Sequence, residues 1–216
     1  MAESLGERLE RCYTAAVHDV MRNRGLTDFV LPPDIRSLSV GAKIAGPAFT
    51  LRGHVDPTIT PHDTYLAWTQ FLGEAPASAI SICQPNNHTV AHMGELSAET
   101  LKRRGVKGYI VDGGCRDTAL IRRIGFPVWC RYATPSDIVG FWLPEGLGEP
   151  IAIGPVTIRA GDFLLADDDG VVVIPAQHAK EIVSETEEVM GRESQVRKAI
   201  IEGMNPQQAY LTYRKF

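Results

Sequence analysis

Two short stretches in the middle of the chain carry residues suited to binding an anion and a metal ion. Gly94-Glu95-Leu96-Ser97 is typical of a helix start, where backbone N–H groups are free to bind an anion. Arg116-Asp117 follows a strand and an Asp-Gly-Gly turn at 112–114. An arginine offers paired donors to a carboxylate or a developing oxyanion, and an aspartate offers a hard oxygen ligand to a divalent metal. Together the two stretches outline a site.

A structural interpretation of Arg116-Asp117 is also available. Asp117 would cap the helix that follows, and Arg116 would pair with a surface carboxylate. For two isolated residues this interpretation would be preferred. Gly94-Glu95 upstream and the glycine turn beside the pair favour the site.

The elements around these stretches alternate between strand and helix. We predict a helix from Gly94 to Arg104, a strand over 106–111, a helix over 118–124 and a strand over 128–132. This order favours parallel strands joined by crossovers. Ligands of such sheets collect at the carboxyl ends of the strands, which is where Arg116 and Asp117 fall.

The remaining elements complete an α/β fold. Before the site we expect a helix over 7–22, two strands around a Gly-Pro corner over 40–51, a helix over 62–73 and a strand over 79–83. After Pro150 we expect short strands in a meander, then helices over 176–190 and 192–202. We predict one domain over 1–216, with a C-terminal helical extension over about 176–216.

Composition excludes several classes of protein. The net charge is −4 with scattered Lys and Arg, which argues against nucleic-acid binding. No apolar run approaches a membrane span, and the polar N-terminus does not resemble a secretory signal. The four cysteines are far apart, which favours free thiols in a cytoplasmic protein.

Other chemistry-bearing residues are better explained structurally. His18-Asp19 is interpreted as a helix-end pair, and Lys43 as a solvent-facing strand residue. His88 and His92 have metal-ligand spacing but lie in a loop with no third ligand, so we do not expect zinc. The aspartates at 167–169 are followed directly by a strand, so we expect a turn and not a calcium loop.

The two stretches and several others resemble one family, which includes the regulator of ribonuclease activity A and the class II 4-hydroxy-4-methyl-2-oxoglutarate aldolases. The most specific element is an acidic residue, twenty intervening residues and Arg-Asp, here Glu95 and Arg116-Asp117. The family often has aspartate in place of Glu95, which alters the reach of the carboxylate. The resemblance extends from about Ala15 to Met190. It also includes Gly41–Thr50, Gly108–Asp117, Gly161-Asp162, Ala166-Asp167 and Asp169–Pro175.

The resemblance implies a fold and residue roles. The fold is a β/β/α sandwich related to the swivelling phosphohistidine domain of pyruvate-phosphate dikinase. In the aldolase branch, N–H groups of Gly94–Ser97 bind a 2-oxo acid carboxylate, Arg116 contacts the keto oxygen, and Asp117 binds Mg²⁺ or Mn²⁺. Glu95 and Glu193 are the candidate catalytic carboxylates. Members form homotrimers or hexamers with sites at subunit clefts, and Glu193 would reach in from a neighbouring subunit.

Three functions follow from these observations. The first is a metal-dependent lyase that cleaves a 4-hydroxy-2-oxo acid to pyruvate and also decarboxylates oxaloacetate, because both reactions pass through the pyruvate enolate. The second is a non-catalytic, protein-binding regulator of ribonuclease activity. The third, a quinone-related methyltransferase, is least favoured because the N-terminal part lacks a glycine-rich strand-turn-helix unit. We expect His62, Asn87, His88 and Trp142 to influence the choice of substrate.

Overall fold

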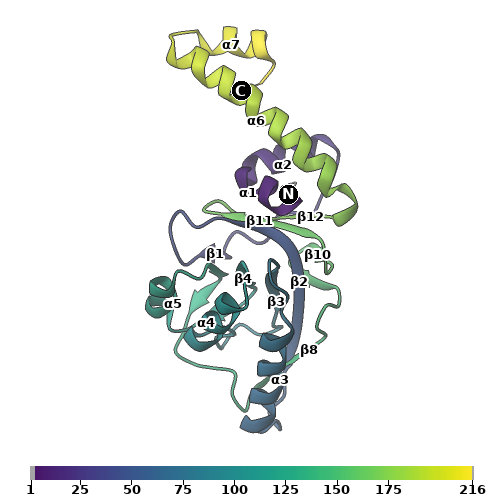
Figure 1. Cartoon of the computed structure of the whole chain (residues 1–216), viewed down its shortest axis with the longest axis vertical. Coiled ribbons are helices and arrows are strands. Elements are labelled where there is room, and N and C mark those ends of the chain that lie inside the picture. Colours follow the sequence, from purple (N-terminus) through teal and green to yellow (C-terminus); the bar gives the residue numbers. More distant parts are fainter. Residues whose placement is uncertain (1–2, 216) are drawn as a thin grey trace.

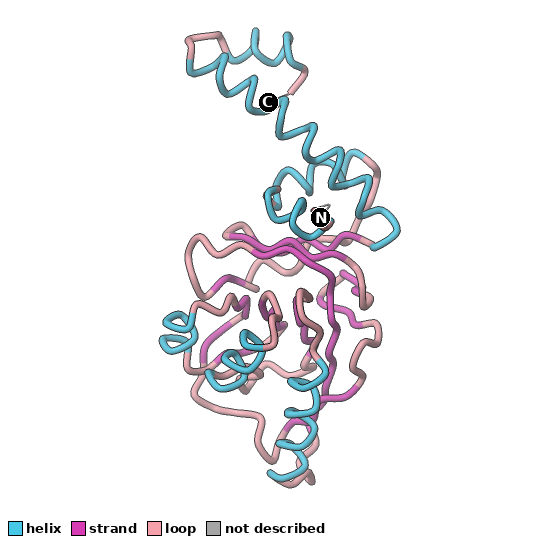
Figure 2. Tube along the Cα trace, in the orientation of Figure 1, coloured by secondary structure: helices cyan, strands magenta, loops and turns pink. Residues whose placement is uncertain are grey.

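The computed structural model describes residues 3–215, which form an α/β body with a helical arm (Figures 1 and 2). The helices are α1 (Leu5–Arg11), α2 (Thr14–Asn23), α3 (Pro61–Glu74), α4 (Glu95–Arg103), α5 (Thr118–Ile124), α6 (Ala179–Ile201) and α7 (Pro206–Tyr213), with a 3₁₀ turn at Ala176–His178. The strands are β1 (Arg36–Ser37), β2 (Ile44–Val55), β3 (Ile80–Gln84), β4 (Gly108–Val111), β5 (Gly114–Cys115), β6 (Val128–Cys130), β7 (Tyr132–Ala133), β8 (Trp142–Glu145), β9 (Ile151–Ile153), β10 (Val156–Ile158), β11 (Phe163–Asp167) and β12 (Gly170–Ile174).

The main sheet has the order β1-β6-β4-β3-β2-β11-β12, and β8 also pairs with β2. The pairs β2–β3, β3–β4 and β4–β6 are parallel, which confirms the crossover arrangement predicted for the middle of the chain. The β11–β12 hairpin confirms the turn predicted at the three aspartates.

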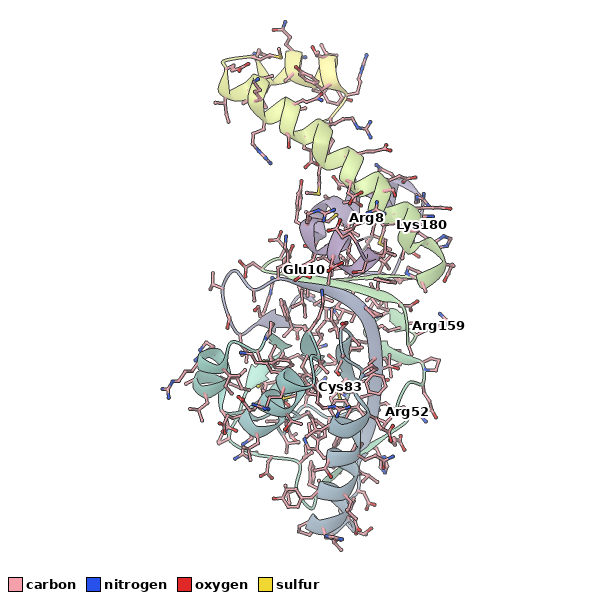
Figure 3. The ribbon with its side chains drawn as sticks, in the orientation of Figure 1. Arg8, Glu10, Arg52, Cys83, Arg159 and Lys180 are labelled. Carbon is pink, nitrogen blue, oxygen red and sulfur yellow. The ribbon has the colours of Figure 1, made fainter. Side chains whose placement is uncertain are left out.

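Three apolar cores define the layers. One core lies between α3, α4 and α5 and one face of the parallel strands, and it contains Tyr109 and the labelled Cys83 (Figure 3). A second lies between the other face of these strands and β9–β12. The third packs α1, α2 and α6 onto the outer face of β11 and β12 (Figure 1). The predicted β/β/α sandwich is therefore confirmed, with an added outer layer of helices.

The Gly-Pro corner predicted within 40–51 is wrong, because β2 continues through it as one strand. Pro47 lies where β2 changes partner: β11 pairs with Ile44–Pro47, and β3 pairs from Ala48 onward. Proline cannot donate to a ladder, so it is tolerated at such a transition.

The single helix predicted over 7–22 is also wrong. Cys12 and Tyr13 are extended and separate α1 from α2. The Asp167 carboxylate accepts hydrogen bonds from the Thr14 backbone N–H (2.8 Å) and hydroxyl (2.7 Å), and Lys43 donates to the Cys12 carbonyl (3.0 Å). These tertiary contacts satisfy the polar groups at the break, which helical periodicity does not reveal. Lys43 therefore has a structural role, because its ammonium group binds the backbone carbonyl at the break between α1 and α2.

The C-terminal segment differs from prediction in one way. The two helices predicted over 176–202 form one continuous helix, α6, which contains Gly191. Helix α7 follows it within the predicted helical extension over about 176–216. In Figure 1 the second half of α6 and all of α7 project beyond the body. Arg8 on α1 anchors the first half of α6 through an ion pair with Glu187 (2.6 Å; Figure 3 labels Arg8).

The helix predicted over 62–73 is confirmed as α3, and the Thr60 side chain caps it by accepting a hydrogen bond from the Asp63 N–H. Its buried face contains Thr64, Trp68, Phe71 and Leu72, whereas Leu66 is exposed. Across residues 3–215, every helix is too short or too polar to cross a membrane.

Candidate functional site

The two predicted stretches are adjacent in the structure. The Arg116 N–H donates to the Met93 carbonyl (2.8 Å), and the His92 N–H donates to the Gly114 carbonyl (2.9 Å). Ala91 and Gly114 form a parallel bridge just before them. The backbone thus holds the start of α4 against the residues that precede α5, so that both helix N-termini meet at one place.

Gly94 is the N-cap of α4 and is glycine for steric reasons. A Cβ at this position would lie 2.9 Å from Asp117 Oδ2 and 3.1 Å from Arg116 Cγ. Its φ of −137° is accessible to any residue, so the requirement comes from the close approach and not from the backbone conformation. Gly94 therefore allows the Arg116-Asp117 pair to reach the helix terminus.

Asp117 adopts the left-handed backbone conformation, with φ 54° and ψ 30°. Its side chain does not cap α5, which corrects the structural interpretation considered above. Oδ2 instead accepts a hydrogen bond from the Glu95 N–H (3.1 Å) at the start of α4. A strained, non-glycine residue that serves a different helix from its own is typical of a functional position.

The Arg116 guanidinium lies between two carboxylates. Nη1 donates to Asp137 Oδ2 (2.8 Å), and Nε lies 3.5 Å from Asp117 Oδ2. The side chain is half-buried, with 35% of its surface exposed. Asp137 was not predicted from the sequence, because the loop between β7 and β8 carries no motif that marks it. It fixes the direction in which Arg116 points.

These residues line a pocket of about 260 Å³. The predicted substrate-binding residues Gly94, Glu95, Leu96 and Ser97 all contribute to its lining, together with Arg116 and Asp117. Within the described chain, the Leu96 and Ser97 N–H groups have no acceptor, whereas the Glu95 N–H is taken by Asp117. The helix terminus therefore presents two free donors to the pocket. The remaining lining residues are Thr64, Tyr65, Trp68, Ala91, His92, Met93, Asp137, Ile138 and Val139.

Helix α3 forms one side of the pocket through Thr64, Tyr65 and Trp68, which were not predicted from the sequence. Trp68 Nε1 donates to Ser97 Oγ (2.8 Å) and so joins α3 to the start of α4. Tyr65 and Trp68 are three residues apart on one helical face, a spacing that would have indicated a shared surface. Of the four residues expected to influence substrate choice, His62, Asn87 and His88 lie outside the lining, and Trp142 packs behind it against Trp68 and His92.

His92 lies fully buried in the pocket lining. Neither of its ring nitrogens has a hydrogen-bond partner among residues 3–215. Burial lowers the pKa of His92 to about 3, with a smaller contribution from nearby His88, so the imidazole is neutral at physiological pH. His88 lies 3.7 Å from the Asp112 carboxylate.

Glu193 does not join this site within the chain. It lies on α6, at the end of the molecule opposite to α4 and α5 (Figure 1). Its carboxylate accepts from the Tyr13 hydroxyl and pairs with Lys215 (3.0 Å). The expectation for Glu193 concerns a neighbouring subunit, and it stays a prediction.

The donor set suits a hard divalent cation held by few protein ligands. In the described part of the chain, no three His, Cys, Asp or Glu side chains are grouped as a metal cage. Mg²⁺ is commonly bound through one or two carboxylates, with waters and substrate oxygens completing its octahedron. Asp117, exposed at the pocket and hydrogen-bonded through one oxygen, fits that mode.

Comparison with known proteins identifies the family. The sequence model for RraA-like proteins, described as Aldolase/RraA, matches residues 14–173. The chain therefore belongs to the RraA-like family, as its motifs predicted.

Individual relatives are distant. Protein DlpA of Legionella pneumophila is 28% identical over 219 residues, which is 97% of this chain but 34% of DlpA. A Halalkalibacterium halodurans protein named "Putative 4-hydroxy-4-methyl-2-oxoglutarate aldolase" is 27% identical, with 87% of this chain and 85% of that protein covered. The crystal structure of Streptomyces coelicolor RraAS2, described as an unusual member of the RNase ES inhibitor RraA protein family, superposes with a TM-score of 0.81. Its identity is 28%, and the match covers 90% of this chain and 96% of that one.

Proposed function

We propose that this protein is a divalent-metal-dependent carbon–carbon lyase. It cleaves a 4-hydroxy-2-oxo acid to pyruvate and a second oxo compound; 4-hydroxy-4-methyl-2-oxoglutarate, which the name of a relative mentions, is one such compound. The observation that supports this most is the convergence of two free helix N–H donors, the Arg116 guanidinium and the Asp117 carboxylate in one pocket. These groups match the carboxylate, the keto oxygen and the metal ion of a 2-oxo acid complex.

Each group of the site interacts with one part of the substrate according to its charge. The Leu96 and Ser97 N–H groups bind the substrate carboxylate at the positive end of α4. Arg116, directed by Asp137, binds the keto oxygen and stabilises the negative charge that develops there. Asp117 would hold Mg²⁺ or Mn²⁺, which supplies Lewis-acid stabilisation of the enolate when bound.

Bond cleavage requires a base as well as an electron sink. The C4 hydroxyl loses its proton to the base, C4 becomes a carbonyl carbon, and the C3–C4 bonding electrons form the pyruvate enolate. Protonation of C3 then gives pyruvate. Glu95 in the pocket lining, and Glu193 from a neighbouring subunit of a homotrimer or hexamer, are the candidates for the base.

Two assays test this proposal. Exchange of the pyruvate methyl protons for deuterium reports enolate formation directly, and pyruvate release from oxaloacetate reports decarboxylation through the same intermediate. We expect both to require Mg²⁺ or Mn²⁺ and to fall by at least about a hundredfold in Arg116→Ala, as for loss of a group that stabilises developing charge. Absence of both reactions with either metal, in a folded wild-type protein, would refute a lyase.

A non-catalytic regulator of ribonuclease activity is the second candidate. The likeness to RraAS2 and the exposed apolar residues of the arm, such as Ile201, favour it. Such a protein would bind a protein partner and leave oxaloacetate unchanged. The exchange assay therefore separates the two candidates.

A further inference from the structure

The contact between Trp68 and Ser97 determines how the Ser97 hydroxyl can be used. Trp68 Nε1 donates a hydrogen bond to Ser97 Oγ at 2.8 Å. An indole N–H can only donate, so the serine oxygen must accept in this pair and its own hydrogen is left for another group. Both side chains belong to one chain, so the contact is present whatever a neighbouring subunit adds to the pocket.

The Ser97 hydroxyl is not used inside its own helix. Serine and threonine hydroxyls within helices commonly donate to the carbonyl four residues earlier, and Thr100 on α4 does so, to the Leu96 carbonyl at 2.7 Å. Among residues 3–215, Ser97 Oγ has Trp68 as its one hydrogen-bond partner. The carbonyl four residues before Ser97, that of Met93, instead accepts from the Arg116 N–H (2.8 Å). The hydroxyl hydrogen is therefore available in the pocket lining.

Packing fixes the direction of the Trp68 N–H. The side chain is buried, and its ring packs against Phe71, with centroids 5.0 Å apart, and against Trp142, with centroids 6.2 Å apart. A ring held on two sides gives the Ser97 oxygen one preferred position. A donor that is positioned before the ligand arrives loses less conformational entropy on binding.

The Ser97 hydroxyl lies beside the other anion-binding groups of α4. The Leu96 and Ser97 N–H groups are the free donors at this helix terminus, and Ser97 and Trp68 both line the pocket. Carboxylate oxygens accept several hydrogen bonds, and such bonds are stronger than those between neutral groups. A metal ion on Asp117 is compatible with this arrangement, because a carboxylate can bind a metal through one oxygen and hydrogen-bond donors through the other.

We propose that Trp68 is a positioning residue, which orients the Ser97 hydroxyl to donate a hydrogen bond to the C1 carboxylate of the 2-oxo acid. This inference rests on the lyase function proposed above. The C1 carboxylate is not part of the C3–C4 bond that breaks, so the hydrogen bond stabilises the bound substrate and the transition state about equally. The pair therefore sets KM and not kcat.

Two single substitutions measure the contribution of the pair in the metal-dependent deuterium exchange of pyruvate. Ser97→Ala removes the hydroxyl, and we expect KM for pyruvate to rise by about tenfold, as for loss of a hydrogen bond to a charged group, with kcat changed by less than about twofold. Trp68→Phe keeps an aromatic ring and removes the N–H, and KM should rise by about three- to fivefold. An unchanged KM in Ser97→Ala overturns the proposal.

Trp129→Phe is the matched control. Trp129 is also buried and donates its indole N–H to a carbonyl, that of Asp167 at 3.0 Å, but it belongs to the core between the parallel strands and β9–β12. The substitution removes the same group away from the pocket. We expect it to leave KM for pyruvate at the wild-type value.

The double variant separates positioning from packing. If the Trp68 N–H acts through the Ser97 hydroxyl, Trp68→Phe should change KM by less than about twofold once Ser97 is alanine. A role of Trp68 in packing α3 against α4 does not depend on that hydroxyl. An equal rise in KM from Trp68→Phe in the wild type and in Ser97→Ala would therefore overturn the assignment of Trp68.

Binding of oxalate separates this inference from the proposed function. Oxalate has carboxylates but no methyl group, so it cannot be turned over by enolate formation, and calorimetry with Mg²⁺ gives its Kd for each variant. The expected Kd ratios are those given above for KM. Oxalate binding with these ratios but without pyruvate exchange refutes the lyase and leaves the donor role of Ser97. Exchange with unchanged KM and Kd in both variants overturns the donor role and leaves the lyase, and absence of both exchange and binding overturns both.

Discussion

At Asp117, a left-handed backbone and a carboxylate turned away from its own helix occur in the same residue. Aspartate tolerates this conformation better than most residues, but glycine adopts it without steric cost. At this position glycine would give the more stable backbone, whereas the proposed activity needs the aspartate carboxylate. Two substitutions can separate the effect on stability from the effect on activity.

We predict that Asp117→Gly is more stable than Asp117→Ala by about 1 kcal/mol, because both lose the carboxylate and only glycine relieves the backbone strain. Both variants should lose metal-dependent pyruvate exchange. Urea unfolding and the exchange assay measure the two effects. Equal stabilities would show that the backbone at this position is unstrained, and full exchange in either variant would contradict the metal assignment.

A second prediction at this scale concerns pH and His92. The folded-state pKa of about 3 lies below the ordinary histidine pKa of 6.5, so between these values the unfolded chain binds the proton and the folded protein does not. The stability that His92 contributes as a neutral residue is therefore present above pH 6.5 and is lost as the pH falls towards 3.

From pH 7 to pH 5, this residue should cost the wild type about 2 kcal/mol of unfolding free energy. His92→Leu removes the titrating group, and its loss over the same interval should be smaller by that amount. Urea unfolding of both proteins at the two pH values gives the comparison. If the wild type and His92→Leu lost the same unfolding free energy between pH 7 and pH 5, His92 would be solvated or protonated in the folded protein.

At the scale of elements, tertiary contacts decide where helices and strands end. The break between α1 and α2 depends on Asp167, which lies in the β11–β12 hairpin and accepts two hydrogen bonds from Thr14. Similarly, the orientation of α3 towards α4 depends on the Trp68–Ser97 contact. Neither partner is near in sequence.

We predict that Asp167→Ala destabilises the fold by about 1–3 kcal/mol, because the Thr14 N–H at a half-buried helix start loses a charged acceptor. Asp168→Ala is a suitable comparison, since Asp168 accepts from the exposed Gly41 N–H and should matter less. Thermal unfolding of the two variants measures the difference. A smaller effect at Asp167 than at Asp168 would contradict this explanation of the break.

At the scale of the whole molecule, the helical arm formed by the second half of α6 and by α7 bears on how subunits assemble. The second half of α6 and all of α7 project beyond the body (Figure 1). Ile201, Tyr210 and Leu211 are exposed on these two helices. Glu193 lies on α6, where the arm begins, and pairs with Lys215 away from the pocket of its own chain. The predicted homotrimer or hexamer would place such an arm against a neighbour, and the predicted role of Glu193 depends on this arrangement.

Mixed oligomers test that role directly. Glu193→Ala and Arg116→Ala should each be inactive alone, because each lacks one part of every site. When the two are unfolded and refolded together, sites that combine an intact Arg116 with a neighbour's intact Glu193 should restore part of the exchange activity. No recovery in oligomers shown to be mixed would contradict a contribution of Glu193 to a neighbour's site, and full activity of Glu193→Ala alone would place Glu193 outside the site. Sedimentation gives the subunit number.

The sequence alone determined the family, the alternation of strands and helices around the site, and six residues of the pocket, Gly94–Ser97, Arg116 and Asp117. These follow from local chemistry: a glycine at a helix start, a glycine turn after a strand, and residue types with fixed binding preferences. The two stretches lie together at one edge of the sheet because the strands are parallel, and the order of elements in the sequence implies this topology.

Only the tertiary structure decided the rest of the pocket and its charge. Asp137 and the pocket residues of α3 reach the site from loops and helices whose packing no local pattern encodes, and Asp117 serves a helix other than the one it begins. The division of 7–22 and the continuity of β2 were likewise decided by partners distant in the chain. The physical reason is common to all: these features depend on contacts between elements, and sequence periodicity reports only the face that an element buries.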